Sequence, residues 1–111
     1  MADIIHLTDK PIRNTAATIQ ELRLAVDVSA YDELDLLLTM YEGSSIAVEI
    51  WTGMQTETEE GWVIVDTAFT SLSANGEAKK NFKNFLRYVR WKQTTAGNAT
   101  FMINGIGRRW A

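Results

Sequence analysis

The 111-residue sequence contains no cysteine, one proline and one histidine. Without cysteine these residues can form no disulfide and no thiolate metal site, so their stability must come from packing, from assembly or from both. A Ser-His-Asp mechanism would depend entirely on His6, which we interpret as a solvent-facing residue on an edge strand. Long apolar runs are missing too. The longest, such as Trp62 to Val65, are far below the roughly 20 residues of a membrane-spanning helix.

The composition is that of one globular domain. Apolar residues make up 46% and charged residues 23% of the chain, a balance typical of folded proteins in water. The first residues lack the basic start, apolar stretch and cleavage site of a secretion signal, so we expect synthesis in the cytoplasm and no membrane segment. Residues 1–20 are polar and weakly patterned and are interpreted as an N-terminal arm or edge segment. Residues 21–111 are interpreted as a single domain.

Apolar residues recur at every second position in several segments, which is the pattern of β-strands with one buried face. The three clearest rows are Leu22, Leu24, Val26 and Val28, then Leu34, Leu36, Leu38 and Met40, then Ile46, Val48 and Ile50. Leu37 and Tyr41 add apolar character to the other side of the second row, so that strand could be covered on both faces. We expect Leu24, Leu36 and Val48 to point into the core, where truncation to alanine would cost roughly 1 to 5 kcal/mol.

The rest of the chain is read in the same way. Residues 55–61 form the loop of a hairpin between a strand ending near Trp51 and a strand beginning at Trp62. Residues 79–84 could form a short helical turn, and residues 85–91 are expected to form a C-terminal hairpin with residues 99–103. A bend is expected at 105–107, and turns are expected at 42–45, 75–76 and 96–98. Six to eight strands separated by turns predict an all-β fold, an antiparallel β-sandwich of jelly-roll-like type.

Charge is distributed unevenly along the chain. Residues 1–66 hold thirteen Asp and Glu against three Lys and Arg, a net charge of −10, whereas residues 67–111 hold one Glu against eight Lys and Arg, a net charge of +7. The two halves could attract each other between subunits, or their strands could alternate in the sheets and neutralise one another within one chain. The sequence leaves both arrangements open.

Three groups of residues are candidates for interaction. They are the C-terminal Arg108, Arg109 and Trp110, the outward-facing Tyr88, Arg90 and Lys92, and the loop carboxylates Glu57, Glu59 and Glu60. Alternation places Phe85, Val89 and Trp91 in the core with Arg87 among them. Arginine and tryptophan are enriched at protein contacts. Basic and aromatic residues together also bind single-stranded nucleic acid, but the net negative charge disfavours that partner.

Other chemistry has weaker support in the residues. Paired loop carboxylates could perform acid and base catalysis or bind calcium, although carboxylates in such loops are usually only solvated. Trp51, Trp62, Trp91 and Trp110 could stack on sugar rings, which keeps a carbohydrate-binding module as the alternative, whereas buried tryptophans would only fill the core. No motif indicates a cofactor.

Residues 86–91, Leu-Arg-Tyr-Val-Arg-Trp, resemble a late strand of discoidin-type, galactose-binding-like jelly rolls, in which a closing hairpin follows. That resemblance implies a β-sandwich that binds glycans or lipids through loops at one end. The chain as a whole is also similar in style to small accessory proteins of tailed-phage virions, through its length, its lack of cysteine and its polar ends. That likeness implies a head-decoration or tail protein.

Together these observations predict a non-catalytic structural module that self-associates or docks on a repetitive protein surface. The expected partner is protein, either a second copy or a larger assembly such as a virion, with glycan as the alternative.

Overall fold

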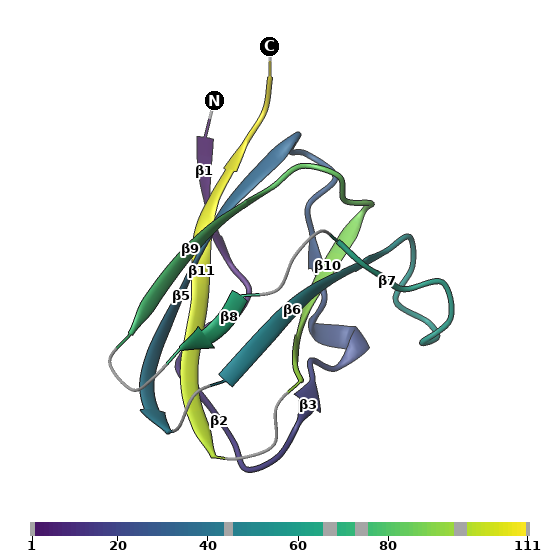
Figure 1. The fold of residues 1–111 in the computed structure, drawn as a ribbon. Helices are drawn as coiled ribbons and strands as arrows, with labels where there is room; N and C mark the ends of the chain where they lie inside the picture. The colour runs from purple at the N-terminus through teal and green to yellow at the C-terminus, as the bar shows by residue number, and fades with distance from the viewer. Residues whose placement is uncertain (1, 44–45, 66–68, 73–75, 95–97, 111) are drawn as a thin grey trace.

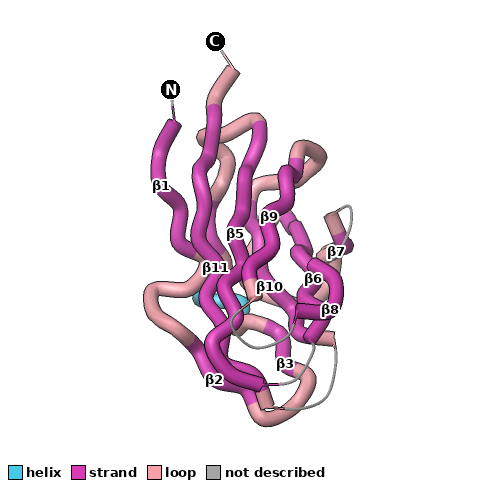
Figure 2. The backbone as a smooth tube through the Cα atoms, turned by 60° about the vertical axis from the view of Figure 1, so that its left-hand side comes forward, coloured by secondary structure: helices cyan, strands magenta, loops and turns pink. Residues whose placement is uncertain are grey.

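The computed structural model describes residues 2–43, 46–65, 69–72, 76–94 and 98–110. These residues form two antiparallel sheets packed face to face, which confirms the predicted all-β sandwich (Figures 1 and 2). The five-stranded sheet has the order β1-β11-β5-β9, with β2 also pairing β11. The six-stranded sheet has the order β3-β10-β6-β7, with β4 pairing β10 and β8 pairing β6. The turns expected at 44–45, at Asn75 and at 96–97 lie outside the described residues.

The strands vary widely in length. Those of the five-stranded sheet are β1 (Ala2–His6), β2 (Ile12–Asn14), β5 (Glu33–Gly43), β9 (Glu77–Phe82) and β11 (Ala99–Arg108). Those of the six-stranded sheet are β3 (Thr18–Ile19), β4 (Val26–Asp27), β6 (Ile46–Gly53), β7 (Val63–Ile64), β8 (Phe69–Leu72) and β10 (Tyr88–Gln93). The described residues thus form more strands than the pattern predicted, because strands of two or three residues are too short to show alternation. β6 and β7 form the expected hairpin around residues 55–61.

The core lies between the sheets and follows the predicted rows on the long strands. Leu34, Leu36, Leu38 and Met40 of β5 are fully buried, as are Val48 of β6 and Val89 of β10. The sheets meet through edge-to-face ring pairs, Trp91 with Phe101 at 5.3 Å and Phe69 with Phe82 at 5.9 Å. The predictions for Leu36 and Val48 are therefore confirmed.

The strand predicted over 22–28 is wrong. Residues Leu22–Leu24 form a 3-10 turn, and only Val26–Asp27 pair with β10. The amide of Gln20 explains the difference, because it donates to the Leu24 carbonyl at 3.1 Å and its oxygen accepts from the Trp91 backbone at 3.3 Å. The Gln20 side chain thus takes ladder bonds that a strand would have made. Leu24 is consequently 46% exposed rather than in the core.

The predicted C-terminal hairpin is also wrong, because β10 and β11 belong to different sheets and face each other across the core. The expected bend at 105–107 is instead the end of β11, which pairs with both β1 and β5 through Arg108. Glycine is required there by close approach, since a Cβ on Gly105 would lie 2.0 Å from the Asp35 carbonyl oxygen. The optional helical turn at 79–84 is replaced by β9, whose Phe82 is buried.

The first twenty residues contribute three of the edge strands. β1 and β2 pair one after the other along the same strand, β11, and β3 pairs with β10. His6 is exposed on β1, with its Nδ1 2.9 Å from the side-chain amide of Asn104. Both ends of the chain lie at the same end of the sandwich (Figure 1).

Candidate interaction surfaces

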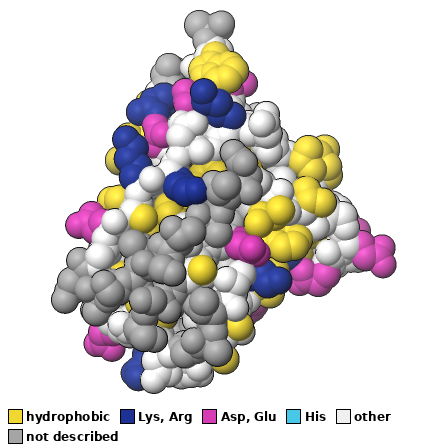
Figure 3. Space-filling view, viewed as in Figure 1, with side chains coloured by type: hydrophobic (Ala, Val, Ile, Leu, Met, Phe, Trp, Pro, Cys, Tyr) yellow, Lys and Arg dark blue, Asp and Glu magenta, His cyan; other side chains and the backbone are white. Residues whose placement is uncertain are grey.

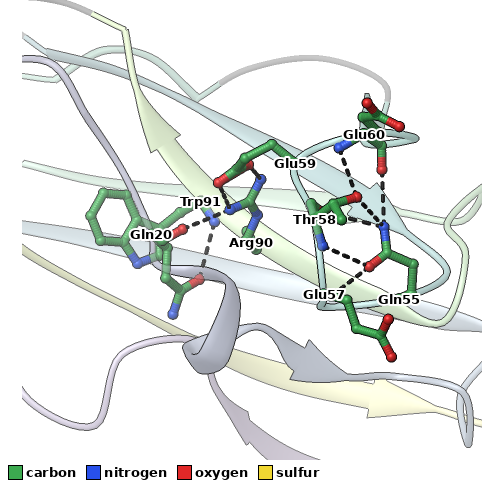
Figure 4. A network of polar contacts seen from close by, with 8 residues as sticks. All are labelled: Gln20, Gln55, Glu57, Thr58, Glu59, Glu60, Arg90 and Trp91. Atoms are coloured by element: carbon green, nitrogen blue, oxygen red, sulfur yellow. Dashed lines mark hydrogen bonds and ion pairs between the residues drawn. The ribbon is translucent and has the colours of Figure 1, made fainter.

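Arg90 lies at the centre of a polar cluster on the outer side of the six-stranded sheet (Figure 4). Its guanidinium donates two bonds to the Glu59 carboxylate, Nη1 to Oε1 at 3.1 Å and Nη2 to Oε2 at 2.6 Å, and Nη1 also donates to the Gln20 carbonyl at 3.0 Å. The ring of Trp62 covers it, with the guanidinium carbon 4.3 Å from the ring centroid. Although Arg90 points outward as predicted, it is only 1% exposed. The prediction of a solvent-accessible Arg90 is therefore wrong.

The β6–β7 loop covers this cluster. Inside the loop, the Gln55 oxygen accepts from the backbone nitrogens of Glu57 and Thr58, and its amide donates to the carbonyls of Thr58 and Glu60. Gly53 makes room for the Trp62 ring, because a Cβ there would lie 2.7 Å from ring carbons. These internal bonds give the loop one shape, and that shape places Glu59 over Arg90.

The electrostatics of the cluster follow from this geometry. The hydrogen bonds from Arg90 favour the ionised carboxylate and lower the pKa of Glu59. A buried guanidinium needs such a partner, because an unpaired buried charge is strongly unfavourable. All three predicted loop carboxylates are exposed, and of them Glu59 forms the ion pair with Arg90. Figure 3 shows acidic side chains at the right-hand tip of the molecule, where this loop lies.

Tyr88 and Lys92 flank Arg90 on the same strand and are half-buried. The Lys92 ammonium lies 5.0 Å from the centroid of the Trp51 ring, and the Trp51 indole donates to Glu49 at 2.9 Å. The guanidinium of Arg87 lies 5.1 Å from the Tyr88 ring and forms an ion pair with Asp27 at 3.4 Å. The expectation of a core position for Arg87 is therefore wrong, because the strand begins only at Tyr88.

The C-terminal residues gather at the end of the five-stranded sheet. Arg108 forms an ion pair with Asp35, and Arg109 Nε donates to the Ala30 carbonyl at 2.9 Å. Trp110 donates its backbone nitrogen to Asp32 at 2.7 Å and its indole nitrogen to Glu33 at 3.0 Å, yet it is 57% exposed. The bond from Trp110, together with one from Asn81, lowers the pKa of Glu33.

Three ion pairs bear on whether the two oppositely charged halves of the sequence neutralise each other within one chain or attract each other between subunits. Arg87 with Asp27, Arg90 with Glu59 and Arg108 with Asp35 each join the basic part of the chain to its acidic part. At these positions the halves neutralise one another within one chain. The three predicted interaction groups are not brought together as one site, since the C-terminal group lies on the five-stranded sheet and the other two lie on the six-stranded sheet.

A surface that the sequence reasoning did not single out lies on the outer side of the five-stranded sheet. Ile4 of β1 stands directly opposite Ile106 of β11, and Leu37 lies on the adjacent β5, with exposures of 76%, 38% and 38%. Met102 of β11, opposite Thr39, continues this side of the sheet. We call the surface defined by Ile4, Leu37, Met102 and Ile106 the open face. In the sequence, the outward-facing Leu37 indicated this surface. Ile106 could not be added to it, because residues 105–107 were predicted to form a bend rather than a strand.

The open face contains a hollow of about 340 Å³. It lies over β5, β9 and β11, and its lining includes Leu37, Lys79, Asn104, Ile106 and Arg108. Tyr41, the other residue predicted to face outward, is 40% exposed near a β-bulge opposite Thr100 and Phe101. The open face therefore combines the projecting side chain of Ile4 with a hollow.

The positions of the tryptophans and the carboxylates bear on the alternative functions, which are glycan binding and metal binding. Trp62 and Trp91 are buried, Trp51 is half-buried and Trp110 is exposed. Within the described ranges, no group of three or more His, Cys, Asp or Glu side chains is positioned to hold a metal ion. No helix in that same part of the chain is long and apolar enough to cross a membrane.

No protein-family model and no curated protein matches this sequence. Among the solved structures that resemble it in fold are the following two. The SPBc2 prophage-derived protein YomS superposes with a TM-score of 0.60 at 13% identity, covering 96% of this chain and 94% of that one. A chain from Bacillus endospore appendages, described as disulfide-linked pili, superposes with a TM-score of 0.50 at 16% identity, covering 100% of this chain and 88% of that one. Both likenesses concern the all-β fold, and they give no specific support to a discoidin-type sandwich.

Proposed function

We propose that this protein is a non-catalytic assembly module, which self-associates or docks on a repetitive protein surface such as a virion. The open face is the observation that carries the proposal. It presents three aliphatic side chains in a contiguous group on a regular sheet, and such groups on soluble domains mark contact surfaces.

The energetics of the open face fit such a role. Covering Ile4, Leu37 and Ile106 would remove apolar area from water, at about 1 kcal/mol or more for each side chain. The polar groups at the rim would contribute orientation more than affinity, because exposed ion pairs add only about 0 to 1 kcal/mol each. The aliphatic centre is therefore the part of the surface on which affinity depends.

The two similar structures favour assembly over catalysis. One is a prophage-derived protein and the other comes from pili, which are themselves polymers of protein subunits. The pili are described as disulfide-linked, whereas the 111 residues here contain no cysteine. Contacts made by these residues would therefore not be disulfides and would depend on surfaces such as the open face.

The test measures mass by light scattering over a wide range of protein and salt concentrations, for the chain alone and mixed with the products of genes adjacent to its own. We expect assemblies larger than one chain that dissociate when Leu37→Lys and Ile106→Lys are combined. The matched control combines Leu24→Lys and Leu86→Lys, which add the same two charges at leucines of similar exposure, 46% and 43%, away from the open face. A chain that stays single in every mixture would overturn the proposal.

A further inference from the structure

We infer that the open face packs against the open face of a second copy of this chain, about a two-fold axis. The inference rests on the proposed function and names the partner and the surface. Its first support is the pattern of β5, in which Leu34, Leu36 and Leu38 face the core while Leu37 faces outward. Apolar residues on both sides of a strand are typical of strands that are covered on both faces.

The two outer sides of the sandwich differ in how they are covered. On the six-stranded sheet, the β6–β7 loop lays Trp62 over Gly53 and Arg90, so the chain itself covers the middle of that side. Met54, Val63 and Ile64, next to this loop, remain exposed. On the five-stranded sheet, the described residues leave Leu37 and Ile106 each 38% exposed. The cover that the β5 pattern anticipates is thus missing from the single chain, and a second chain can supply it.

The carboxylates Glu33 and Asp35 on the open face are already paired or hydrogen-bonded, so the face can be covered without burying an unsatisfied carboxylate. Asp35 is paired with Arg108, and Asn81 donates to both Asp35 and Glu33 at 2.7 Å. The Trp110 indole donates to Glu33 as well. Lys79 lies on the edge strand β9, where its long side chain can keep the ammonium group in water. Burial of a paired and hydrogen-bonded carboxylate avoids the penalty of an isolated one.

The shape and the charges of the face suit an identical partner. Ile4 projects with 76% of its surface exposed, and the hollow lined by Leu37 and Ile106 lies on the same face. The face also carries both signs of charge, in Glu33 and Asp35 and in Lys79 and Arg108. A two-fold contact requires one patch that is complementary to itself. Such a patch must hold both a projection and a hollow, and both positive and negative charges.

The area is sufficient for a specific but modest dimer. The strands of the five-stranded sheet hold 35 residues, which at about 3.3 Å per residue and about 4.8 Å between strands give a face of roughly 550 Å². Two such faces would bury on the order of 1,100 Å², just above the roughly 1,000 Å² that a specific interface needs. Two sheets would then pack face to face about 10 Å apart, as they do inside the sandwich.

The lack of cysteine makes a direct test possible. Leu37 lies near the middle of β5 and of the open face, so in a two-fold pair it lies close to its own counterpart. We expect Leu37→Cys to form a disulfide-linked dimer under mild oxidation on the order of a hundredfold faster than Leu24→Cys, because paired thiols have an effective concentration in the millimolar range. Non-reducing gels at several time points measure the rates, and Ile106→Cys is the second variant should Leu37→Cys fold poorly.

The outcomes separate the two proposals. Self-association of the wild-type chain with equal cross-linking of Leu37→Cys and Leu24→Cys would overturn the two-fold contact and keep the assembly function. If the chain associated with the product of a neighbouring gene but not with a second copy of itself, the two-fold contact would likewise be overturned and the assembly function kept. Fast cross-linking of Leu37→Cys together with loss of self-association in Leu37→Lys would support the inference.

Discussion

At the residue scale, Arg90 is the largest side chain that is fully buried among the described residues. A guanidinium that is 1% exposed sits on the outward side of a sheet because Glu59, the Gln20 carbonyl and the Trp62 ring surround it. Arginine suits this position because its planar fork matches a carboxylate with two parallel bonds and its face stacks on an aromatic ring. The cluster therefore gives the outer side of the six-stranded sheet a small second core.

Replacing Glu59 with Gln should destabilise the protein at neutral pH by about 1 to 3 kcal/mol, since a buried cation would lose a charged acceptor. The pKa of Glu59 is lowered in the folded state from its ordinary value of 4.5. Its contribution is therefore complete above that value and is lost as the pH falls through the lower folded-state pKa. Urea unfolding of both proteins from neutral to acidic pH should show free energies of unfolding that converge as the pH falls.

The control for this prediction is Glu60→Gln, the neighbouring exposed carboxylate of the same loop. It should leave the free energy of unfolding within about 0.5 kcal/mol of the wild-type value. A gap between wild type and Glu59→Gln that stays constant down to strongly acidic pH would contradict the assigned role of the ionised carboxylate.

At the element scale, β11 holds the five-stranded sheet together because it pairs with β1, β2 and β5. Its two glycines face different obstacles. A Cβ on Gly105 would meet the backbone of Asp35 and Leu36, which cannot move without breaking the β5–β11 ladder. A Cβ on Gly107 would meet the side chains of Ile5 and Tyr31, which can shift.

We therefore expect Gly105→Ala to be the more destabilising substitution, at about 3 kcal/mol or more, and Gly107→Ala to cost about 1 to 3 kcal/mol. Thermal and urea unfolding of the two variants measure the difference. Equal effects would indicate that the β5–β11 pairing is looser than this register requires.

The β6–β7 loop supplies a second prediction at this scale. Gln55→Ala should remove the bonds that its side chain makes to Glu57, Thr58 and Glu60, and thereby free the loop that carries Glu59. Hydrogen exchange of the Glu57 and Thr58 amides should accelerate, while exchange in β5 stays unchanged. Thr56→Ala in the same loop is the control, and equal exchange in the two variants would contradict the anchoring role of Gln55.

Which elements could be predicted from the sequence depended on strand length. Alternation in β5 and β6 identifies their buried faces, because a long strand repeats its pattern several times. The same alternation at Leu22 and Leu24 was misleading, since the side chain of Gln20, just before these residues, takes over the ladder bonds there. The Arg90–Glu59 pair could not be predicted either, because its partners lie 31 residues apart and meet only through the loop conformation.

At the scale of the whole molecule, the sandwich could be predicted but the assignment of strands to sheets could not. Residues 85–91 and 99–103 look like a hairpin, yet the chain crosses from one sheet to the other between them. Period-two patterns report which side of a strand is dry and carry no information on its neighbours. The open face was hidden for the same reason, since its residues come from β1, β5 and β11.

Leu36→Ala and Leu24→Ala test the core as the structure defines it. Leu36 is fully buried between the sheets, so its truncation should cost about 2 to 5 kcal/mol. Leu24 is 46% exposed on the 3-10 turn, so its truncation should cost less than about 1 kcal/mol. If chemical denaturation showed similar losses of unfolding free energy for the two variants, Leu24 would have to be buried, as the strand predicted over 22–28 requires.

The position of β11 also has a consequence for biosynthesis. Residues 99–108 form an inner strand of the five-stranded sheet, and among the described residues β1 pairs in that sheet with this strand alone. During synthesis β1 therefore has no pairing partner, and β5 lacks one of its two neighbours, until residues 99–108 have left the ribosome. The five-stranded sheet should form only after that point, and until then the chain should be a client of the chaperones that guard emerging chains.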